Sequence, residues 1–339
     1  MITIRSYQEQ DALSIEAIIR RAFTLTAFDV DPLVPTGTSA EVAWRVWASP
    51  ALTRADEVNT CLVAEDSDTS SVLGFVIFGA HNRYSKILGK KIASIILIAV
   101  DPDRGMEKGI GTALLQTLIE KLAAMDFRYI SVGTDTDNMA AMGLYQKCGF
   151  RTVLNWGNWR FYADHNMLPE VVLPQSDIIE PVHEGFDKDT IKALASLFGR
   201  PSSLVNDKRF SQQVRKNFEE EFIKNVVKDI NANTIKALVL KKDDMSAGLA
   251  TYQEVDFLTE ITGKPWIRIH DLNIIPVARS QNNGTRLLLR TMQQIVSEYG
   301  DDSIIEVFCP LNNWAMHKVL MKAHFQLVHC DTTLHLKIG

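Results

Sequence analysis

The sequence predicts two consecutive copies of one α/β domain, each built on a mixed sheet with helices on both faces. The first observation behind this prediction is an internal repeat of about 175 residues, because self-similarity at a fixed spacing indicates repeated structural units. The second is the order of apolar segments in the first half, which alternate between strand and helix periodicity. The length of 339 residues also suffices for two hydrophobic cores.

Two pairs of segments define the repeat. Pro276 follows Pro102 by 174 residues, and each proline comes shortly after an apolar segment. Asn313 follows Asn138 by 175 residues, and each asparagine opens a helical pattern that ends before a phenylalanine. Between the copies, a polar segment with two prolines interrupts both periodicities. We therefore expect a first domain over residues 1–165, a linker over 166–177 and a second domain over 178–339.

Each element of the first copy is expected from its local pattern. Residues 14–23 form an amphipathic helix, since Ile15, Ile18 and Ile19 recur at helical spacing, and a second helix is expected around Trp44. The remaining helices are expected over residues 111–124 and 138–147, and the strands over residues 2–5, 60–66, 72–81, 92–100, 129–134, 151–154 and 158–163. The last two strands are expected to form a hairpin that turns at residues 155–157.

Composition and charge exclude several functions. The chain has 36 basic and 41 acidic residues, and its net charge of −5 provides no basic field that would hold a nucleic acid. No apolar segment approaches the roughly 20 residues that a membrane helix needs. The polar start indicates no secretory signal, so the cytoplasm is the expected location. Four cysteines without CxxC spacing predict reduced thiols, and histidines without ligand spacing predict no metal site.

The junction after residues 92–100 predicts an anion-binding site. A continuous apolar strand ends at Val100, and a helix begins near Gly111 after a loop that contains Gly109. The free N–H groups and positive dipole of a helix N-terminus bind phosphate or pyrophosphate, and glycines let the backbone approach the anion. Lys108 and Arg104 add positive charge, although an ordinary strand-turn-helix connection would also use glycines here.

A second segment, DNMAAMGLYQKCGF, supports the first because its spacing is independent. Asn138, Ala141 and Tyr145 lie roughly on one face of its helix. Together the two segments resemble the motifs of the GNAT superfamily of acetyl-coenzyme A-dependent N-acetyltransferases. The first motif is represented by Val100, Pro102, Gly109 and Gly111, and the second by Asn138, Ala141, Leu144, Tyr145, Lys147, Gly149 and Phe150.

The first motif departs from the family pattern in two ways. One extra residue lies between Pro102 and Gly109, and Met106 stands where the family usually has arginine or glutamine. We expect Arg104 to stand in for that side chain. Because backbone N–H groups make most of the phosphate contacts in this family, we expect the enlarged loop to keep its binding capacity.

The resemblance implies two tandem GNAT-like acyl-coenzyme A N-acyltransferase domains, with acetyl-coenzyme A (acetyl-CoA) as the cosubstrate. It implies that the strand over residues 92–100 splays from the strand over 129–134, and that the pantetheine arm pairs with the backbone in the opening. The pyrophosphate would bind at residues 106–112. The implied cofactor-binding residues are Ile98, Ala99, Val100, Met106, Glu107, Lys108, Gly109, Ile110, Gly111, Thr112, Asn138, Tyr145 and Lys147.

The implied reaction is acetyl transfer to a primary amine of a small molecule or peptide by direct attack. A backbone N–H near Val100 would stabilise the oxyanion. Tyr145 is the expected catalytic general acid for the leaving thiolate, because phenol and thiol pKa values of about 10 and 8.5 are close to balanced. The base that deprotonates the amine stays unassigned, with four possible residues: Glu65, His81, Asp135 and Asp137.

The second copy is expected to be degenerate and non-catalytic. Asn282 stands where the first copy has Gly109, and Leu320 replaces Tyr145, so the proton donor is lost. His324 replaces the glycine before the final phenylalanine of the motif. Two alternatives remain: a non-catalytic acyl-coenzyme A sensor or interaction protein, and an enzyme similar to mycothiol synthase with an active C-terminal half. The two halves are expected to depend on each other.

Overall fold

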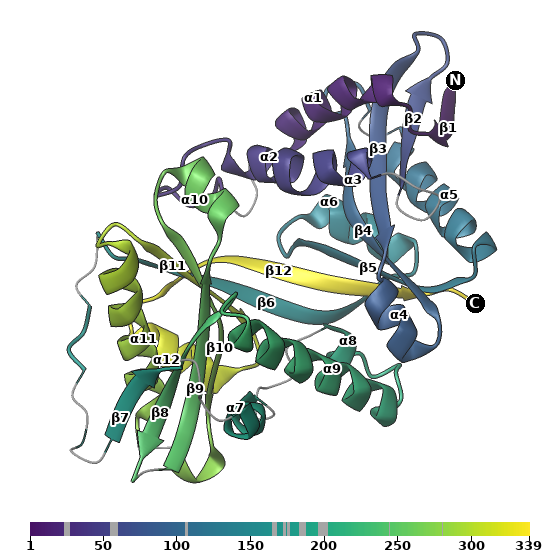
Figure 1. Ribbon diagram of the computed structural model, residues 1–339. Helices are drawn as coiled ribbons and strands as arrows, with labels where there is room; N and C mark the ends of the chain where they lie inside the picture. The colour runs from purple at the N-terminus through teal and green to yellow at the C-terminus, as the bar shows by residue number, and fades with distance from the viewer. Residues whose placement is uncertain are drawn as a thin grey trace. The chain divides into compact units, whose positions relative to one another are not determined.

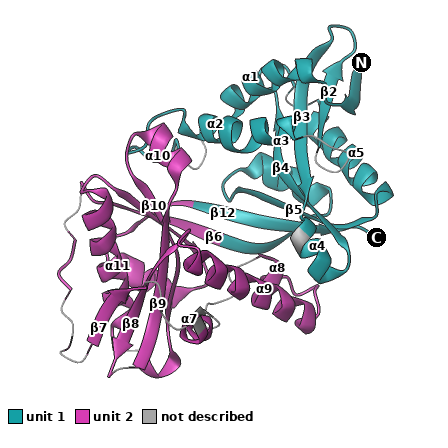
Figure 2. Cartoon of the chain, in the orientation of Figure 1, with its two compact units in different colours: residues 1–155, 330–339 teal, residues 156–329 magenta. Residues whose placement is uncertain are grey.

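A computed structural model describes residues 1–23, 28–54, 60–105, 108–164, 168–171, 174, 177–182, 188–195, 203–243, 245–279 and 281–339. These residues form two compact units (Figure 2), the first made of Met1–Asn155 and Cys330–Gly339 and the second of Trp156–His329. None of the helices in these ranges combines the length and apolar character that crossing a membrane requires. The predicted fold class, a mixed α/β sheet repeated in tandem, is confirmed.

The sheet of the first unit runs in the order β1-β2-β3-β4-β5-β12 (Figure 1). Its strands are β1 (Ile2–Ser6), β2 (Thr60–Asp66), β3 (Ser71–Ala80), β4 (Lys91–Val100), β5 (Phe127–Asp135) and part of β12 (Gln326–Lys337). β4 and β5 are parallel, since a helix connects them, and the other described neighbours are antiparallel. The continuous apolar sequence of β3 accounts for its burial along most of its length.

Helices cover both faces of this sheet. They are η1 (Glu9–Asp11), α1 (Ala12–Ala22), α2 (Thr38–Val42), the π-helical η2 (Ala43–Ala48), α3 (Ser49–Thr53), α4 (Asn82–Leu88), α5 (Ile110–Ala124) and α6 (Met139–Lys147). Ile15, Ile18 and Ile19 of α1 are fully buried in one core cluster, whereas Leu114 and Leu118 of α5 are fully buried in another. The alternating side chains of β3 and β4 contribute to both clusters, as expected for a sheet covered on both faces.

The sheet of the second unit runs in the order β6-β11-β10-β9-β8-β7. Its strands are part of β6 (Arg151–Tyr162), with β7 (Asp177–Pro181), β8 (Lys236–Lys242), β9 (Met245–Glu254), β10 (Trp266–Ile274) and β11 (Ile304–Pro310). Its helices are α7 (Lys188–Ala195), α8 (Ser203–Asn206), α9 (Gln212–Asn231), α10 (Asp256–Thr262), η3 (Pro276–Ala278), α11 (Asn283–Tyr299) and α12 (Trp314–Lys322). The strand-helix-strand order of the first unit is therefore repeated.

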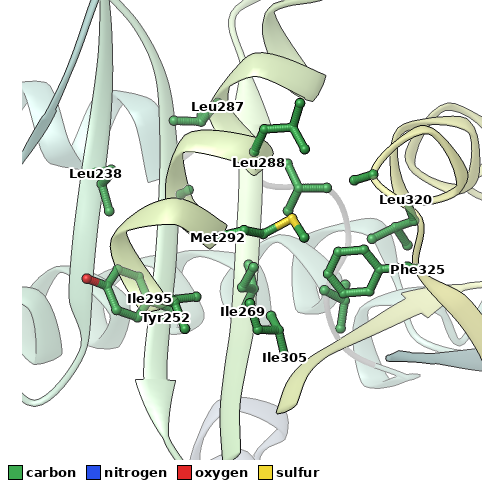
Figure 3. Packing of buried hydrophobic residues seen from close by; sticks show 14 of the residues in the cluster. Leu238, Tyr252, Ile269, Leu287, Leu288, Met292, Ile295, Ile305, Leu320 and Phe325 are labelled. Atoms are coloured by element: carbon green, nitrogen blue, oxygen red, sulfur yellow. The ribbon is translucent and has the colours of Figure 1, made fainter. Parts of the chain in front are cut away.

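Helix α11 packs on the sheet of the second unit through a continuous apolar face (Figure 3). Leu288, Met292 and Ile295 recur at helical spacing and are fully buried, in the same cluster as Ile269 of β10 and Ile305 of β11. The second unit thus has a hydrophobic core of its own, which its loss of motif residues has not removed.

The long strands β6 and β12 each pair with strands from the other half of the sequence. β6 pairs antiparallel with β11 from Trp156 to Tyr162, within the second unit. β12 pairs antiparallel with β5 from Asp331 to Lys337, within the first unit. Each unit is therefore completed by a strand from the other half of the sequence.

The hairpin expected at residues 155–157 is wrong, because β6 continues through these residues as one strand. Gly157 serves a close approach rather than a turn: a Cβ there would lie 2.9 Å from a side-chain carbon of Leu327. The compact units also divide the chain at residues 155 and 329, rather than at the expected boundaries near 165 and 178. The physical reason is that β6 is one continuous strand whose residues 156–162 pair with β11 of the second unit.

Candidate functional site

Strands β4 and β5 diverge in the first unit. Their parallel pairing ends at Ser94 opposite Ser131, although β4 continues to Val100 and β5 to Asp135. Beyond Ser94, the edge of β4 toward β5 has no ladder partner among the described residues, while its other edge pairs with β3. Unpaired backbone groups in such an opening can hydrogen-bond an extended ligand. This part of β4 contains the predicted residues Ile98, Ala99 and Val100.

A bulge and a glycine widen the opening. The register of β3 and β4 shifts between Ile77 and Phe78, which leaves Ile96 of β4 as an extra residue. Ile96 is 36% exposed, although most of its strand is buried. On β5, a Cβ added at Gly133 would meet no atom within 4 Å. Both strands therefore leave room beside the backbone where they separate.

The N-terminus of α5 follows the end of β4. Its N-cap, Gly109, has a left-handed φ of 72°, and no side chain caps the helix. A Cβ at Gly109 would meet no atom within 4 Å, and Lys108 is exposed beside it. Open space, free N–H groups and the helix dipole together fit a pyrophosphate. Met106 and Glu107, also predicted to bind the cofactor, lie outside the described residues.

Three elements converge at Gly111. A Cβ there would lie 3.2 Å from Leu144 of α6 and 3.7 Å from Val100 at the end of β4. The absence of a side chain thus lets the first turn of α5 approach α6 and β4. Ile110 is buried in the core beneath this turn, and Thr112 is half-buried within it. The structure therefore brings the two sequence motifs together around the end of β4.

Tyr145 of α6 is buried in the same core, with a 3% exposed side chain and a ring centroid 5.7 Å from that of Phe150. Burial raises the pKa of its hydroxyl above the usual value near 10. The near balance of pKa values expected from the sequence therefore does not hold in the protein. The hydroxyl group of Tyr145 stays protonated at neutral pH and can donate a hydrogen bond to a nearby anion.

The motif asparagine caps a helix. The side-chain oxygen of Asn138 accepts a hydrogen bond from the N–H of Ala141 at 3.0 Å, at the N-terminus of α6. In the second unit, Asn313 accepts a hydrogen bond from the N–H of Met316 at 3.2 Å, at the N-terminus of α12. Capping explains why both copies have this residue. Lys147 is exposed in the last turn of α6, where a cation complements the helix dipole.

Arg104 has a protein partner. Its Nε donates to Asp101 at 2.8 Å, and Arg21 donates to the same carboxylate at 2.9 Å. Asp101 is fully buried, and although burial opposes ionisation, the hydrogen bond from Arg104 holds its pKa below the usual range. Arg104 thus anchors the loop after β4, and the expectation that it faces an anion gains no support. An acidic residue directly after a buried strand, with an arginine three residues later, was the overlooked signal.

The four possible bases lie in different surroundings. Glu65 is ion-paired at 2.5 Å with an arginine of β1. Asp135 ends β5, and Asp137 is exposed in the following turn. His81 directly follows β3, and its Nε2 lies 2.6 Å from the hydroxyl of Ser94. His81 therefore contacts the residue at which β4 and β5 separate.

The second unit repeats the backbone of this site with other side chains. The pairing of β10 and β11 ends at Ile269 opposite Val307, and the register of β9 and β10 shifts just beyond it. Asn282 has a φ of 62°, so it adopts the left-handed conformation of Gly109 and occupies the N-cap position of α11. Leu320, at the tyrosine position, is fully buried. The second unit therefore keeps the backbone conformation of the site but has no tyrosine at this position.

Diverging parallel strands followed by a glycine turn and a helix define an acyltransferase fold of the GNAT type, and comparison with known families agrees. Residues 21–150 match the model of the acetyltransferase (GNAT) family. The N-terminal half of the chain is therefore similar to this family over the segment that contains the two motifs. The match covers the segment that contains the glycine turn and Tyr145.

Two curated relatives are also acetyltransferases. Over 157 residues, the chain is 28% identical to a mycothiol acetyltransferase of Clavibacter michiganensis, a match that covers 44% of this chain and 42% of the relative. Over 98 residues, it is 33% identical to an L-methionine sulfoximine/L-methionine sulfone acetyltransferase of Pseudomonas aeruginosa, covering 29% of this chain and 54% of the relative. The matched parts thus span about half the length of these relatives.

Two solved structures resemble the whole chain. A GCN5-related N-acetyltransferase from Sphaerobacter thermophilus has a TM-score of 0.63 at 17% identity, with 99% of this chain and 96% of that chain covered. A tandem GNAT protein from the clavulanic acid biosynthesis pathway has a TM-score of 0.59 at 13% identity, with 100% and 99% covered. These likenesses extend the tandem GNAT fold over both units.

Proposed function

We propose that the first unit is an N-acetyltransferase that transfers the acetyl group of acetyl-CoA to a primary amine, and that the second unit is non-catalytic. The observation that carries the proposal is the end of β4–β5 pairing at Ser94 and Ser131, which opens the sheet toward the glycine turn of α5. The opening lies within the segment that matches the GNAT family. In the second unit, the tyrosine position is a buried leucine.

The residues around the opening fit acetyl-CoA, which supplies an acetyl group activated as a thioester. The unpaired backbone edge of β4 beyond Ser94 would hold the pantetheine arm at Ile98–Val100, and an N–H of the same edge would stabilise the oxyanion. The N-terminus of α5, with Gly109, Gly111 and Thr112, would hold the pyrophosphate. Tyr145 would keep its proton until a thiolate forms nearby and would then donate it.

The proposed acceptor class is a primary amine of a small molecule or peptide. One relative is named for L-methionine sulfoximine and L-methionine sulfone, and the other is named for mycothiol. A panel of L-methionine sulfone, glucosamine, tyramine and an alanyl peptide samples amino acid, sugar, aromatic and peptide amines. Free thiol released from acetyl-CoA only when one of these amines is present would support the proposal, whereas binding without such release would favour the sensor.

The cofactor assignment is tested by placing the same charge at matched positions of the two units. Gly109 and Asn282 both adopt left-handed φ values at a helix N-cap, a conformation that aspartate tolerates. An acid at an N-cap also suits the helix dipole, so neither variant should lose stability. Gly109→Asp should weaken acetyl-CoA binding at least tenfold in calorimetric titration, because its carboxylate would face the pyrophosphate.

The matched control is Asn282→Asp, which should leave the dissociation constant of acetyl-CoA unchanged. The reverse pattern, with binding weakened only by Asn282→Asp, would move the cofactor site to the second unit. Equal binding by both variants and the wild type would remove the helix N-terminus from the site.

A further inference from the structure

A row of polar side chains crosses the first unit where β4 and β5 diverge. Ser94 of β4 lies opposite Ser131 of β5, and Ser131 lies opposite His335 of β12. Their sequence neighbours Ile130 and Leu334 belong to the core under α5. Because side chains alternate along a strand, the polar row faces the other side of the sheet.

His81 extends this row from β3. Gly79 lies opposite Ser94 and has no side chain to cover it. The backbone N–H of His81 donates to the carbonyl of Ile92 at 2.8 Å, which holds the residue against β4. From there its Nε2 reaches the Ser94 hydroxyl at 2.6 Å. The histidine and the serine are both half-buried, beside the opening at which the bulge residue is exposed.

The corresponding row of the second unit is an ion-paired cluster. Arg268 of β10 lies opposite Glu306 of β11, which lies opposite Arg160 of β6. Arg268 is 2.6 Å from the carboxylate, and Arg160 is 3.7 Å from it. Glu306 and Arg160 are fully buried, so this carboxylate is neutralised by two guanidinium groups. The row in the first unit is instead made of hydroxyl and imidazole groups.

The surroundings of His81 favour the neutral imidazole, which is the form that can accept a proton. Burial, and secondly the neighbouring His335, lowers its pKa below the usual value of 6.5. Among the side chains that the structure describes, the ionisable groups that face it are His335 from β12 and Tyr84 of α4, whose ring centroid is 5.6 Å away. A lowered pKa favours the neutral ring at neutral pH, and in the tautomer that carries its proton on Nδ1 the Nε2 atom accepts the hydrogen bond of the Ser94 hydroxyl.

We propose that His81 removes the proton of the acceptor amine through the hydroxyl of Ser94. This inference rests on the proposed function, since it assigns the base for the same acetyl transfer. As the amine nitrogen bonds to the acetyl carbon, its N–H bond breaks and the proton passes to Ser94 Oγ. The proton of Ser94 passes to His81 Nε2.

The electron pair of the carbon–sulfur bond leaves with the sulfur, which takes the proton of Tyr145. One proton is thus gained at His81 and one is lost at Tyr145, and exchange with solvent restores both residues. Ser94 ends each cycle with a proton as it began, because it accepts one and donates one. Ser94 contacts the reacting nitrogen, and His81 acts through it.

The test compares four variants, using the amine of the panel that the wild type acetylates fastest. His81→Gln keeps a polar group near Ser94 but removes the base, and Ser94→Ala removes the relay. Each should lower kcat about 10²-fold or more, with the dissociation constant of acetyl-CoA unchanged. Ser94→Thr restores the hydroxyl and should recover most of the lost rate. Ser131→Ala is the matched control, and it should keep the wild-type kcat.

The pH profile separates a base from a structural residue. In the wild type, kcat should fall as the pH drops through the pKa of His81, because the ring then carries a proton; this acidic limb should be absent in His81→Gln. An unchanged rate and acidic limb in His81→Gln would overturn the inference and leave the proposed function standing. Wild-type protein that binds acetyl-CoA but releases no thiol with any of the four amines would overturn both.

Discussion

At Tyr145, the surroundings determine what one hydroxyl group can do. The residue is 3% exposed, and burial raises its pKa, so its proton is held across the neutral range. A hydroxyl with a raised pKa is a weaker acid than free phenol, but it is always present in the donor form. Its contribution to the proposed reaction is therefore a positioned proton that a thiolate can accept as the carbon–sulfur bond breaks.

Tyr145→Phe should lower kcat about 10²-fold while the dissociation constant of acetyl-CoA stays nearly unchanged. The ring keeps its contact with Phe150, so the melting temperature should change little. Because a thiolate can leave without protonation near its own pKa of about 8.5, the deficit should shrink as the pH rises toward that value. Steady-state kinetics from about pH 6.5 to about pH 9, a range that includes the thiol pKa, would measure this change in the deficit. Wild-type turnover in the variant would leave Tyr145 a packing residue only.

At the residue scale, the sequence predicted which side chains gather at the site better than what each one does. Gly111 of the first motif lies against Leu144 of the second motif and against Val100 at the end of β4. Asn138 was placed in the cofactor site, but its side-chain oxygen caps α6. An asparagine at a motif position can cap a helix or bind a ligand, and the motif alone does not distinguish these two roles. Only the hydrogen-bond geometry distinguishes them.

At the element scale, the two units share left-handed positions that only one of them fills with glycine. Gly149 has a φ of 87° after α6, and the equivalent His324 has a φ of 62° after α12. A residue with a Cβ is strained in this conformation by about 1–2 kcal/mol. The second unit has kept the turn geometry and tolerates the strain, since the same backbone hydrogen bonds close both helices.

His324→Gly should stabilise the protein by about 0.5–1 kcal/mol, because the relieved strain exceeds the added entropy of the unfolded glycine. Gly149→His, the matched change in the first unit, should destabilise it by about 1 kcal/mol. Urea unfolding monitored by circular dichroism would measure both shifts in the midpoint. Equal midpoints for all three proteins would show that the turn relaxes without cost.

Strands and helices with strong periodicity were predictable, and their connections were not. The continuous apolar sequence of β4 identified a buried strand within one residue of its observed start at Lys91. By contrast, the sequence at residues 155–157 is typical of a turn, yet β6 passes straight through it. Tertiary pairing decides between these outcomes, because Trp156 and the residues after it find β11 as a partner. No local pattern contains that information.

At the scale of the whole molecule, strand exchange determines which residues each unit needs. β5 pairs with residues 331–337, so the first unit requires a segment encoded far from its motifs. In a fragment of residues 1–165, β12 is missing, and the segment that could pair with β5 in its place is residues 156–162 of β6. The offset of the repeat would then place Arg160 at the position of His335. Arg160 is fully buried beside Glu306 in the second unit, and the fragment lacks that carboxylate. Burying an unpaired charge costs about 3–5 kcal/mol.

A fragment of residues 1–165 should therefore melt well below the first unit of the intact protein. A second fragment, with residues 1–155 joined through an Asn-Gly turn to residues 330–339, restores the native partner of β5. It should unfold cooperatively and bind acetyl-CoA. Calorimetry of the two fragments beside the full chain would compare them directly. If the fragment of residues 1–165 melted like the intact protein, the exchanged strand would be dispensable.

The position of β12 in the sequence also determines when the first unit can be completed during synthesis. Residues 330–339 emerge from the ribosome only after residues 156–329. At about 5–20 residues per second, synthesis of this segment lasts roughly 9–35 s. During it, the N-terminal half carries a complete set of helices and motifs, but the edge of β5 lacks its native partner. Because an unpaired strand edge can pair with another chain, we expect the N-terminal half to be most prone to misassociation during this interval.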